Sequence, residues 1–287
     1  MTDNGATYSY YPGCSLHGTS REYDASTQAV CAELGIELKE LSDWVCCGAS
    51  SGHSLDETLN IGLPAHTLKL AEKEGMDVAV PCAACYNRLK VAEHALQEKE
   101  GVREQMKDLL DYEFQGTVQV LNLVELIKDR VGLEKIRSKV VKPLTGLKVV
   151  CYYGCLLVRP AEVTHFDDPE HPRSLDEIME AVGAEVLNWS YKTECCGGSL
   201  SLTRDDIVKG LVDGIVDMAK EAGAQAIVTL CPLCLENLEM RQSDGTYPVF
   251  YFTELLGVAF GLKESEHWLK KHLVDSTSLM KSLRLLS

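Results

Sequence analysis

Ten of the twelve cysteines in the 287-residue chain form two sets of five with the same order. The first set reads Cys14-x31-Cys46-Cys47-x34-Cys82-x2-Cys85, and the second reads Cys155-x39-Cys195-Cys196-x34-Cys231-x2-Cys234. Cysteines that recur at fixed spacing in a reducing compartment indicate metal ligation or redox chemistry rather than disulfides. The repeated x34 interval makes the alternative of buried, purely structural thiols or vicinal disulfides a weak one.

Five thiolates are one more than a simple site requires. A structural zinc ion is closed by four ligands, and an ordinary [4Fe-4S] cube is held by four cysteines. Adjacent side chains in an extended segment point to opposite sides, so Cys46 and Cys47 would reach different irons or bridge them. The glycine after each pair, Gly48 or Gly197, lets the backbone approach inorganic sulfide. The pattern predicts an iron–sulfur cluster of unusual shape with an accessible iron, and zinc in one half is the alternative.

The sequence around the cysteines is also duplicated. "YYPGC" parallels "YYGC", "CCGAS" parallels "CCGGS", and "VQVLNLVEL" at 118–126 parallels "YPVFYFTEL" at 247–255. These pairs indicate a tandem repeat with its seam near residue 143.

Each half alternates between strand and helix patterns. Strands are predicted at 6–11, 36–41, 77–81, 147–153, 184–189 and 226–230, and helices at 21–35, 58–75, 174–183 and 205–223. This alternation predicts an α/β fold of two tandem domains related by a pseudo-twofold axis, each a small parallel sheet covered by helices. Because all ten cysteines follow predicted strands, each domain should carry its metal site at the carboxyl edge of its sheet.

Two domains and a tail are expected, at 1–143, 144–262 and 263–287. The tail lies outside the duplication, and its apolar residues recur at helical spacing, which suits a cap on the domain or a docking helix. The segment 98–113 is expected to form a solvated helix.

Composition limits the partners. The chain is 45% hydrophobic with a net charge of -15, which indicates a soluble protein and argues against nucleic-acid binding. No apolar run approaches the ~20 residues of a membrane span. The N-terminus lacks a basic and an apolar signal region, so a cytoplasmic location is expected.

The duplicated C-x31-CC-x34-CxxC pattern resembles the CCG-domain family, in particular the catalytic B subunits of heterodisulfide reductases. The resemblance covers residues 8–257. It implies two noncubane [4Fe-4S] clusters, each held by five cysteines. The implied ligands are Cys14, Cys46, Cys47, Cys82 and Cys85 for one cluster, and Cys155, Cys195, Cys196, Cys231 and Cys234 for the other.

The resemblance also implies a function. A disulfide of the CoM-S-S-CoB type, or an analogous thiol disulfide, would bind between the two clusters and be reduced to two thiols. The implied partners are a small iron–sulfur protein similar to the C subunits of such reductases and a flavin protein similar to their A subunits. A partner is needed because no G-x-G-x-x-G fingerprint follows a strand here. The alternative is an electron-relay subunit of a larger oxidoreductase without its own disulfide turnover.

Several other residues are candidates for roles near the cysteines. His17, His53, Arg88 and Arg159 could contact an anionic disulfide or donate a proton, although loop residues of these types are often only solvated. Cys31 and Cys151 belong to neither set and are expected to be buried free thiols. Tyr11, Tyr152 and Tyr153 are expected to serve in packing.

Overall fold

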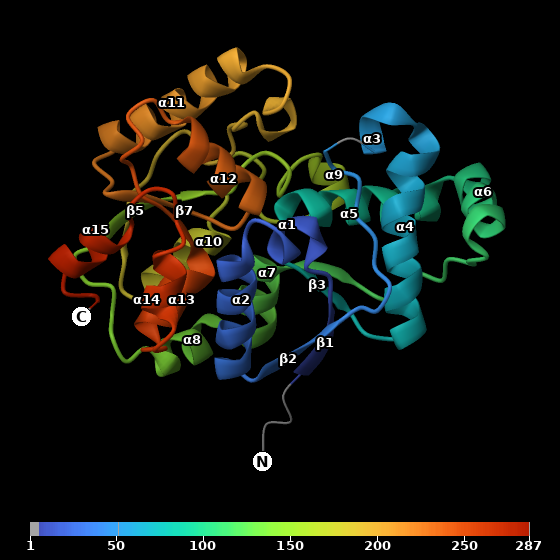
Figure 1. The fold of residues 1–287 in the computed structure, drawn as a ribbon. Coiled ribbons are helices and arrows are strands. Elements are labelled where there is room, and N and C mark those ends of the chain that lie inside the picture. The colour runs from blue at the N-terminus through green and yellow to red at the C-terminus, as the bar shows by residue number, and fades with distance from the viewer. Residues whose placement is uncertain (1–5, 51, 287) are drawn as a thin grey trace.

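The computed structural model describes residues 6–50 and 52–286; residues 1–5 of the predicted first domain and Ser287 of the predicted tail lie outside them. The described chain forms two parallel four-stranded sheets with equivalent strand orders, β2-β1-β3-β4 and β6-β5-β7-β8 (Figure 1). The first sheet contains β1 (Ala6–Tyr10), β2 (Ile36–Glu40), β3 (Val78–Val80) and β4 (Val120–Asn122). The second contains β5 (Lys148–Tyr152), β6 (Glu185–Val186), β7 (Ala226–Thr229) and β8 (Val249–Tyr251). The predicted α/β fold with two repeated sheets is confirmed.

The helices of the first half cover both faces of its sheet, with α2 on one side and α4 and α5 on the other (Figure 1). They are α1 (Gly13–His17), α2 (Arg21–Glu33), α3 (Gly52–Leu55), α4 (Glu57–Glu74), α5 (Ala83–Glu98), α6 (Glu100–Leu110), α7 (Leu123–Glu125), the π-helix η1 (Leu126–Val131) and α8 (Leu133–Lys139).

The second half repeats this plan. Its helices are α9 (Ala161–Thr164), α10 (Ser174–Ala181), the 3-10 turn η2 (Gly198–Leu200), α11 (Asp205–Glu221), α12 (Pro232–Arg241) and α13 (Phe252–Ala259). In the tail, α14 (Ser265–Leu269) and α15 (Thr277–Ser282) follow.

Local sequence explains the long helix α4. The Asp56 carboxylate accepts backbone N–H groups of Thr58 and Leu59 and so caps the first turn, while Gly75 adopts a left-handed conformation and ends the helix. The helix continues past Pro64.

The structure differs from the prediction at the expected strand 184–189. Only Glu185 and Val186 pair with β5. Beyond them Trp189 donates its indole N–H to the carbonyl of Cys151, 3.0 Å away. The chain therefore leaves the sheet edge before the adjacent cysteines are reached.

In each half, the helix that follows the last strand packs against a helix of the other half. Helix α13 of the second half lies beside α2 of the first, and α7 of the first contacts α10 of the second (Figure 1). Because α2 and α10 hold equivalent positions in the repeat, these contacts are related by a pseudo-twofold axis. A single apolar cluster runs through both halves.

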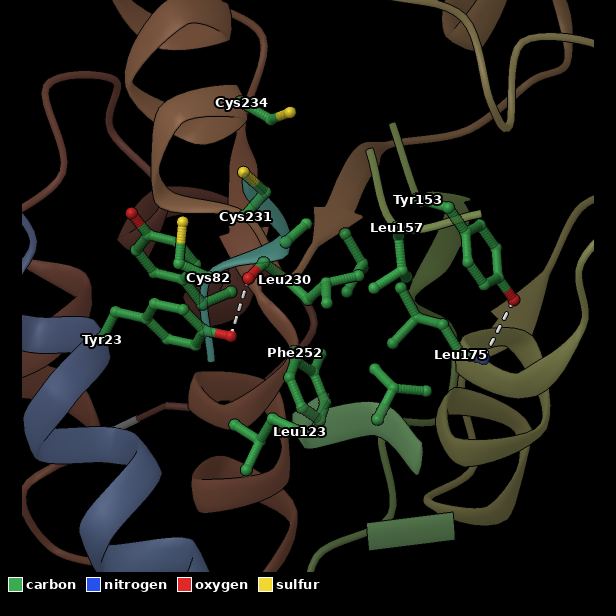
Figure 2. Close-up of a cluster of buried hydrophobic side chains, with 14 of the residues drawn as sticks. Tyr23, Cys82, Leu123, Tyr153, Leu157, Leu175, Leu230, Cys231, Cys234 and Phe252 are labelled. Carbon is green, nitrogen blue, oxygen red and sulfur yellow. Dashed lines mark hydrogen bonds between the residues drawn. The ribbon is translucent and has the colours of Figure 1, made fainter. Parts of the chain in front are cut away.

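Tyr23 lies at the junction (Figure 2). Its buried hydroxyl lies 2.8 Å from the carbonyl of Leu230 and 3.1 Å from that of Pro81, the residues directly before Cys231 and Cys82. Its ring stacks on Tyr251 with centroids 4.0 Å apart. One side chain therefore ties together the strand ends that lead into both CxxC motifs.

The tail forms two short helices that pack on the molecule. Helix α14 contacts α13 and α2, and Trp268, Leu269 and Met280 are buried. Leu273, by contrast, is 71% exposed. The domain limits at 143 and 262 stay a prediction.

Among the helices of the described chain, none combines the length and apolar character of a bilayer span.

Candidate functional site

All ten paired cysteines lie beyond the carboxyl ends of the strands, and equivalent cysteines occupy equivalent places. Cys14 lies in α1 after β1, the adjacent pair at 46–47 lies in the loop after β2, and Cys82 precedes α5 after β3. Cys82 and Cys231 are the N-cap residues of α5 and α12. The N-terminus of a helix carries partial positive charge, which favours a thiolate. Of these two thiols only Cys231 has a lowered pKa, chiefly through its hydrogen bond with Cys234, whereas Cys231 raises the pKa of Cys82.

The thiols converge in the same pattern in both halves. The sulfur of Cys46 lies 3.8 Å from that of Cys14, and Cys47 lies 3.2 Å from Cys85. In the second half Cys196 lies 3.6 Å from Cys234, and Cys195 hydrogen-bonds Cys155. Cys82 and Cys231 hydrogen-bond each other across the boundary between the halves. The two groups of thiols therefore meet at the junction.

The adjacent cysteines face different surroundings, as their extended backbone predicts. Cys46 and Cys195 are exposed, whereas Cys47 and Cys196 are buried. The hydrogen bond between the Cys46 and Cys14 thiols lowers the pKa of Cys46 to about 2, with support from Cys47 and the Gly48 amide. A hydrogen bond from Cys155 lowers the pKa of Cys195 to about 6. In the first pair Cys46 is the more readily ionised thiol, because Cys46 raises the pKa of Cys47 to about 11. In the second pair the pKa of Cys196 is lowered as well, chiefly by its hydrogen bond with Cys234.

Tyrosines three residues before the first cysteine of each set fix the adjacent pairs. Tyr11 donates its hydroxyl to the carbonyl of Val45 at 2.7 Å, and Tyr152 donates to that of Glu194 at 2.7 Å. These carbonyls belong to the residues directly before Cys46 and Cys195. The expectation of packing holds for the buried rings, but it missed the repeated hydrogen bond, for which the only signal was the repeated Tyr-to-Cys spacing.

Glycines at equivalent positions let the backbone pass close to the thiols. Gly13 and Gly154 have φ of 71° and 67°, a conformation that favours glycine. A Cβ on Gly13 would lie 3.0 Å from the sulfur of Cys85, and one on Gly154 would lie 3.2 Å from that of Cys234. A larger residue at either position would push into the space around the thiols.

A cavity of about 190 Å³ adjoins the second set of cysteines. All five cysteines of that set line it. The first half contributes Ala83 and Ala84 at the start of α5, Arg88, and His53 of α3 with the residues just before that helix. The cavity therefore lies between the halves, with both of them forming its wall.

The structure brings two of the four other candidates to this cavity. Arg88 and His53 line it. His17 instead pairs with Glu40 at 3.1 Å and packs edge-on against Trp44.

Arg159, the fourth candidate, does not line the cavity. It pairs with Glu170 at 3.0 Å and lies 3.1 Å from the hydroxyl of Thr193, two residues before Cys195. Through these contacts Arg159 can support the loop that carries the second pair of adjacent cysteines.

Cys31 and Cys151 are fully buried, as predicted. Burial raises the pKa of Cys31 to about 12, so this thiol is protonated at neutral pH. Cys151 lies within β5 and its pKa is also raised by burial.

Two buried or partly buried polar side chains lock the halves together and were not identified from the sequence. Asn87 of α5 donates to the carbonyls of Leu156 and Arg159, at 3.0 and 2.7 Å. At the equivalent position of α12, Glu236 accepts the hydroxyl of Ser20 at 2.7 Å. Each CxxC helix thus holds the loop that follows the first cysteine of the opposite half.

The cysteine sulfurs are suited to hold a cluster of several atoms rather than a single ion. Five thiols converge on one cavity in the second half, and that cavity is far larger than a single ion needs. Within residues 6–50 and 52–286, no three histidine, cysteine or acidic side chains have the compact arrangement that holds one ion.

Comparisons with known proteins agree with the repeat. The cysteine-rich CCG domain matches residues 8–90 and 149–239. The 8-methylmenaquinol:fumarate reductase membrane anchor subunit of Wolinella succinogenes is 31% identical over 283 residues, which cover 95% of this chain and 98% of that protein. The B subunit of the ferredoxin/F(420)H(2)-dependent CoB-CoM heterodisulfide reductase of Methanosarcina acetivorans is 25% identical over 289 residues, with 96% of each chain covered.

A hypothetical protein from Helicobacter pylori has a similar solved structure, with a TM-score of 0.71 at 11% identity. The match covers 93% of this chain and 51% of that one, about half of its length, and it supports the fold alone. The two family matches coincide with the two sets of cysteines, and so the chain belongs to the cysteine-rich CCG domain family, as a relative of heterodisulfide reductase B subunits.

Proposed function

We propose that this protein is the disulfide-reducing subunit of a heterodisulfide reductase-like complex, with two noncubane [4Fe-4S] clusters. The observation that carries the proposal is the cavity between the halves, lined by five cysteines of one repeat and by α5 of the other. The reaction would convert one disulfide, two electrons and two protons into two thiols. The relatives named as heterodisulfide reductase subunits make an oxidoreductase complex the setting for this chemistry.

The two sets of five cysteines, one in each half, would hold the clusters with five thiolates each. When bound, such clusters supply single electrons and offer iron positions that bind sulfur. The protein's own groups would orient the disulfide: the cavity wall at Ala83 and Ala84 limits its position, and Arg88 supplies positive charge. His53, the other candidate on the wall, could donate a proton to a product thiolate.

The proposal is tested by giving the anaerobically purified protein a reduced viologen and a panel of disulfides, and by measuring thiol release. Release of two thiols per disulfide supports the proposal. Normal reduction of the clusters with no thiol release from any disulfide would contradict it.

An electron-relay subunit is the second candidate. The relative with 31% identity is named as the membrane anchor subunit of a menaquinol:fumarate reductase, a complex whose name contains no disulfide. In the viologen experiment, this candidate predicts clusters that reduce and reoxidise while every disulfide survives.

Either function requires partner proteins. We propose an iron–sulfur protein similar to the C subunits of heterodisulfide reductases as the electron donor, and a flavin protein similar to their A subunits beyond it. A cytoplasmic location is part of the proposal. Co-purification of the tagged chain from its own cells, with a count of flavin and iron in the complex, tests these partners.

A further inference from the structure

Strand β2 is an open edge of the first sheet. It lies at one end of the order β2-β1-β3-β4, beside helix α2 (Figure 1). The strand at the other end, β4, is buried along its whole length, whereas Glu37, Lys39 and Glu40 of β2 are exposed. In the second half the equivalent strand, β6, pairs with β5 over two residues only. Within the described chain, β2 is therefore the longest exposed edge of either sheet.

The backbone groups on the outer side of β2 are unpaired. Leu41, directly after the strand, donates its backbone N–H to the carbonyl of Tyr10 in β1. Because the backbone groups of successive residues in a strand point to opposite sides, those of Ile36, Leu38 and Glu40 point away from β1. Within residues 6–50 and 52–286, none of these outward N–H and C=O groups has a hydrogen-bond partner. An edge of this kind can pair with a further strand.

Space for such a strand lies beside β2. A hollow of about 410 Å³ is lined by residues of α2, of β2 and of the turn that joins them, namely Gln28, Ala32, Gly35, Ile36, Glu37 and Leu38. A Cβ built on Gly35 would meet no atom within 4 Å, and Ala32 is exposed. Because these two residues are small, no bulky side chain of the turn covers the start of the edge.

The sequence of β2 is complementary to itself in an antiparallel arrangement. In "IELKE", residues 36–40, a twofold axis at Leu38 places Glu37 of each copy opposite Lys39 of the other. Directly opposite side chains have Cβ atoms about 4.5–5.5 Å apart, which is close enough for an ion pair. The outward residues then also oppose each other, Ile36 with Glu40 and Leu38 with its own copy, at the hydrogen-bonded positions of the ladder.

The two charged side chains are available for this pairing. Glu37 accepts the hydroxyl of Thr7 at 3.0 Å with one oxygen, which leaves its other oxygen open. Lys39 is exposed and has no acidic partner among the described residues. Opposite charges placed directly across two antiparallel strands stabilise the pair, whereas like charges destabilise it. The charges of β2 therefore favour a second β2 in this register.

We infer that two copies of the chain pair antiparallel through β2, which joins their four-stranded first sheets into one continuous sheet. A twofold contact uses the same edge in both copies, so the assembly closes at a dimer. None of residues 36–40 lines the cavity between the halves. The dimer therefore goes beyond the proposed function and does not depend on it.

The test is analytical sedimentation of the anaerobically purified full chain over a series of concentrations, in which wild type should form a dimer. Glu37→Lys and Lys39→Glu each place like charges opposite one another at both positions. Each should weaken the dimer by at least about tenfold. An equimolar mixture of these two variants restores opposite charges at both positions, and should form a heterodimer about as tightly as wild type pairs with itself.

Two further variants test the backbone ladder and the role of net charge. Leu38→Pro removes an outward N–H and none of the bonds to β1, so the chain should stay folded and should not pair. Lys107→Glu reverses a charge on α6, where Lys107 pairs with Glu113 at 3.4 Å, and should leave the dimer unchanged. If the proline variant does not fold, the two charge variants and their mixture still decide.

Three results would overturn the inference. The first is a wild type that stays monomeric at every concentration. The second is a dimer that survives Leu38→Pro in a folded chain. The third is a mixture of Glu37→Lys and Lys39→Glu that pairs no better than either variant alone, because the predicted register would then be wrong.

Discussion

Tyr11 and Tyr152 show what residue spacing does and does not predict. The repeated sequence predicts that both are buried aromatic residues beside a first cysteine, and both are. It does not predict their hydrogen bonds, because the acceptor carbonyls lie 34 and 42 residues further along the chain and approach only once the loops have closed. The positions of the cysteines after the strands could be predicted. The side chains that hold the adjacent pairs could not.

The substitution Tyr152→Phe tests this positioning role. It keeps the ring and removes the hydroxyl, so the free energy of unfolding should fall by about 1 kcal/mol. The absorption and paramagnetic signals of the cluster proposed for the second half should change, because the loop before Cys195 loses its tether. The control is Tyr247→Phe, which removes a 2.7 Å bond to the Ala224 carbonyl away from the cysteines. Identical spectra for the wild type and both variants would show that Tyr152 contributes only through packing of its ring.

At the scale of elements, helices were predicted correctly where apolar residues recur at helical spacing over a long stretch and a glycine marks the end. The expected helices at 21–35, 58–75 and 205–223 correspond to α2, α4 and α11. It was wrong for most of the strand at 184–189, since the indole of Trp189 bonds Cys151 and the chain turns away after Val186. A tertiary contact of this kind leaves no local signal.

The tail also shows the limit of prediction from local sequence. Its apolar spacing left a cap and a docking helix as open alternatives, and in the structure Trp268 and Leu269 are buried. His272 then inserts between two buried carboxylates, 2.7 Å from Glu239 and 2.9 Å from Glu254. Glu239 belongs to α12, so the tail clamps the helix that carries Cys234.

This clamp makes stability depend on pH. Burial alone would lower the pKa of His272, but Glu254 and Glu239 raise it to about 10. A raised pKa means that the folded state binds the proton more tightly. The contribution is therefore complete below the ordinary histidine pKa near 6.5 and is lost as pH rises toward 10.

The variant His272→Gln should remove this dependence. Denaturant midpoints of wild type should fall between about pH 7 and pH 10. The variant should be less stable than wild type at pH 6 by about 3 kcal/mol, because it leaves two buried carboxylates without a cation. Its midpoints should change less over the same range. Parallel curves for the two proteins would show that His272 does not carry the effect.

At the scale of the whole molecule, the duplication predicts two similar sheets and a pseudo-twofold axis, and the structure has both. It does not predict how the halves join. Asn87 and Glu236 occupy equivalent positions but are different residue types, and each forms hydrogen bonds with different groups of the opposite half. Tyr23 belongs to one repeat yet lies against carbonyls of both. Contacts between the two halves depend on how the folded halves pack against each other, so a repeat in the sequence does not reveal them.

The measurement that tests the paired clusters most directly is the iron and zinc content of the protein purified without oxygen. Two clusters held by five cysteines each predict about eight irons per chain and no zinc. Iron in only one half with zinc in the other, or zinc alone, would contradict the paired clusters on which the proposed disulfide chemistry depends.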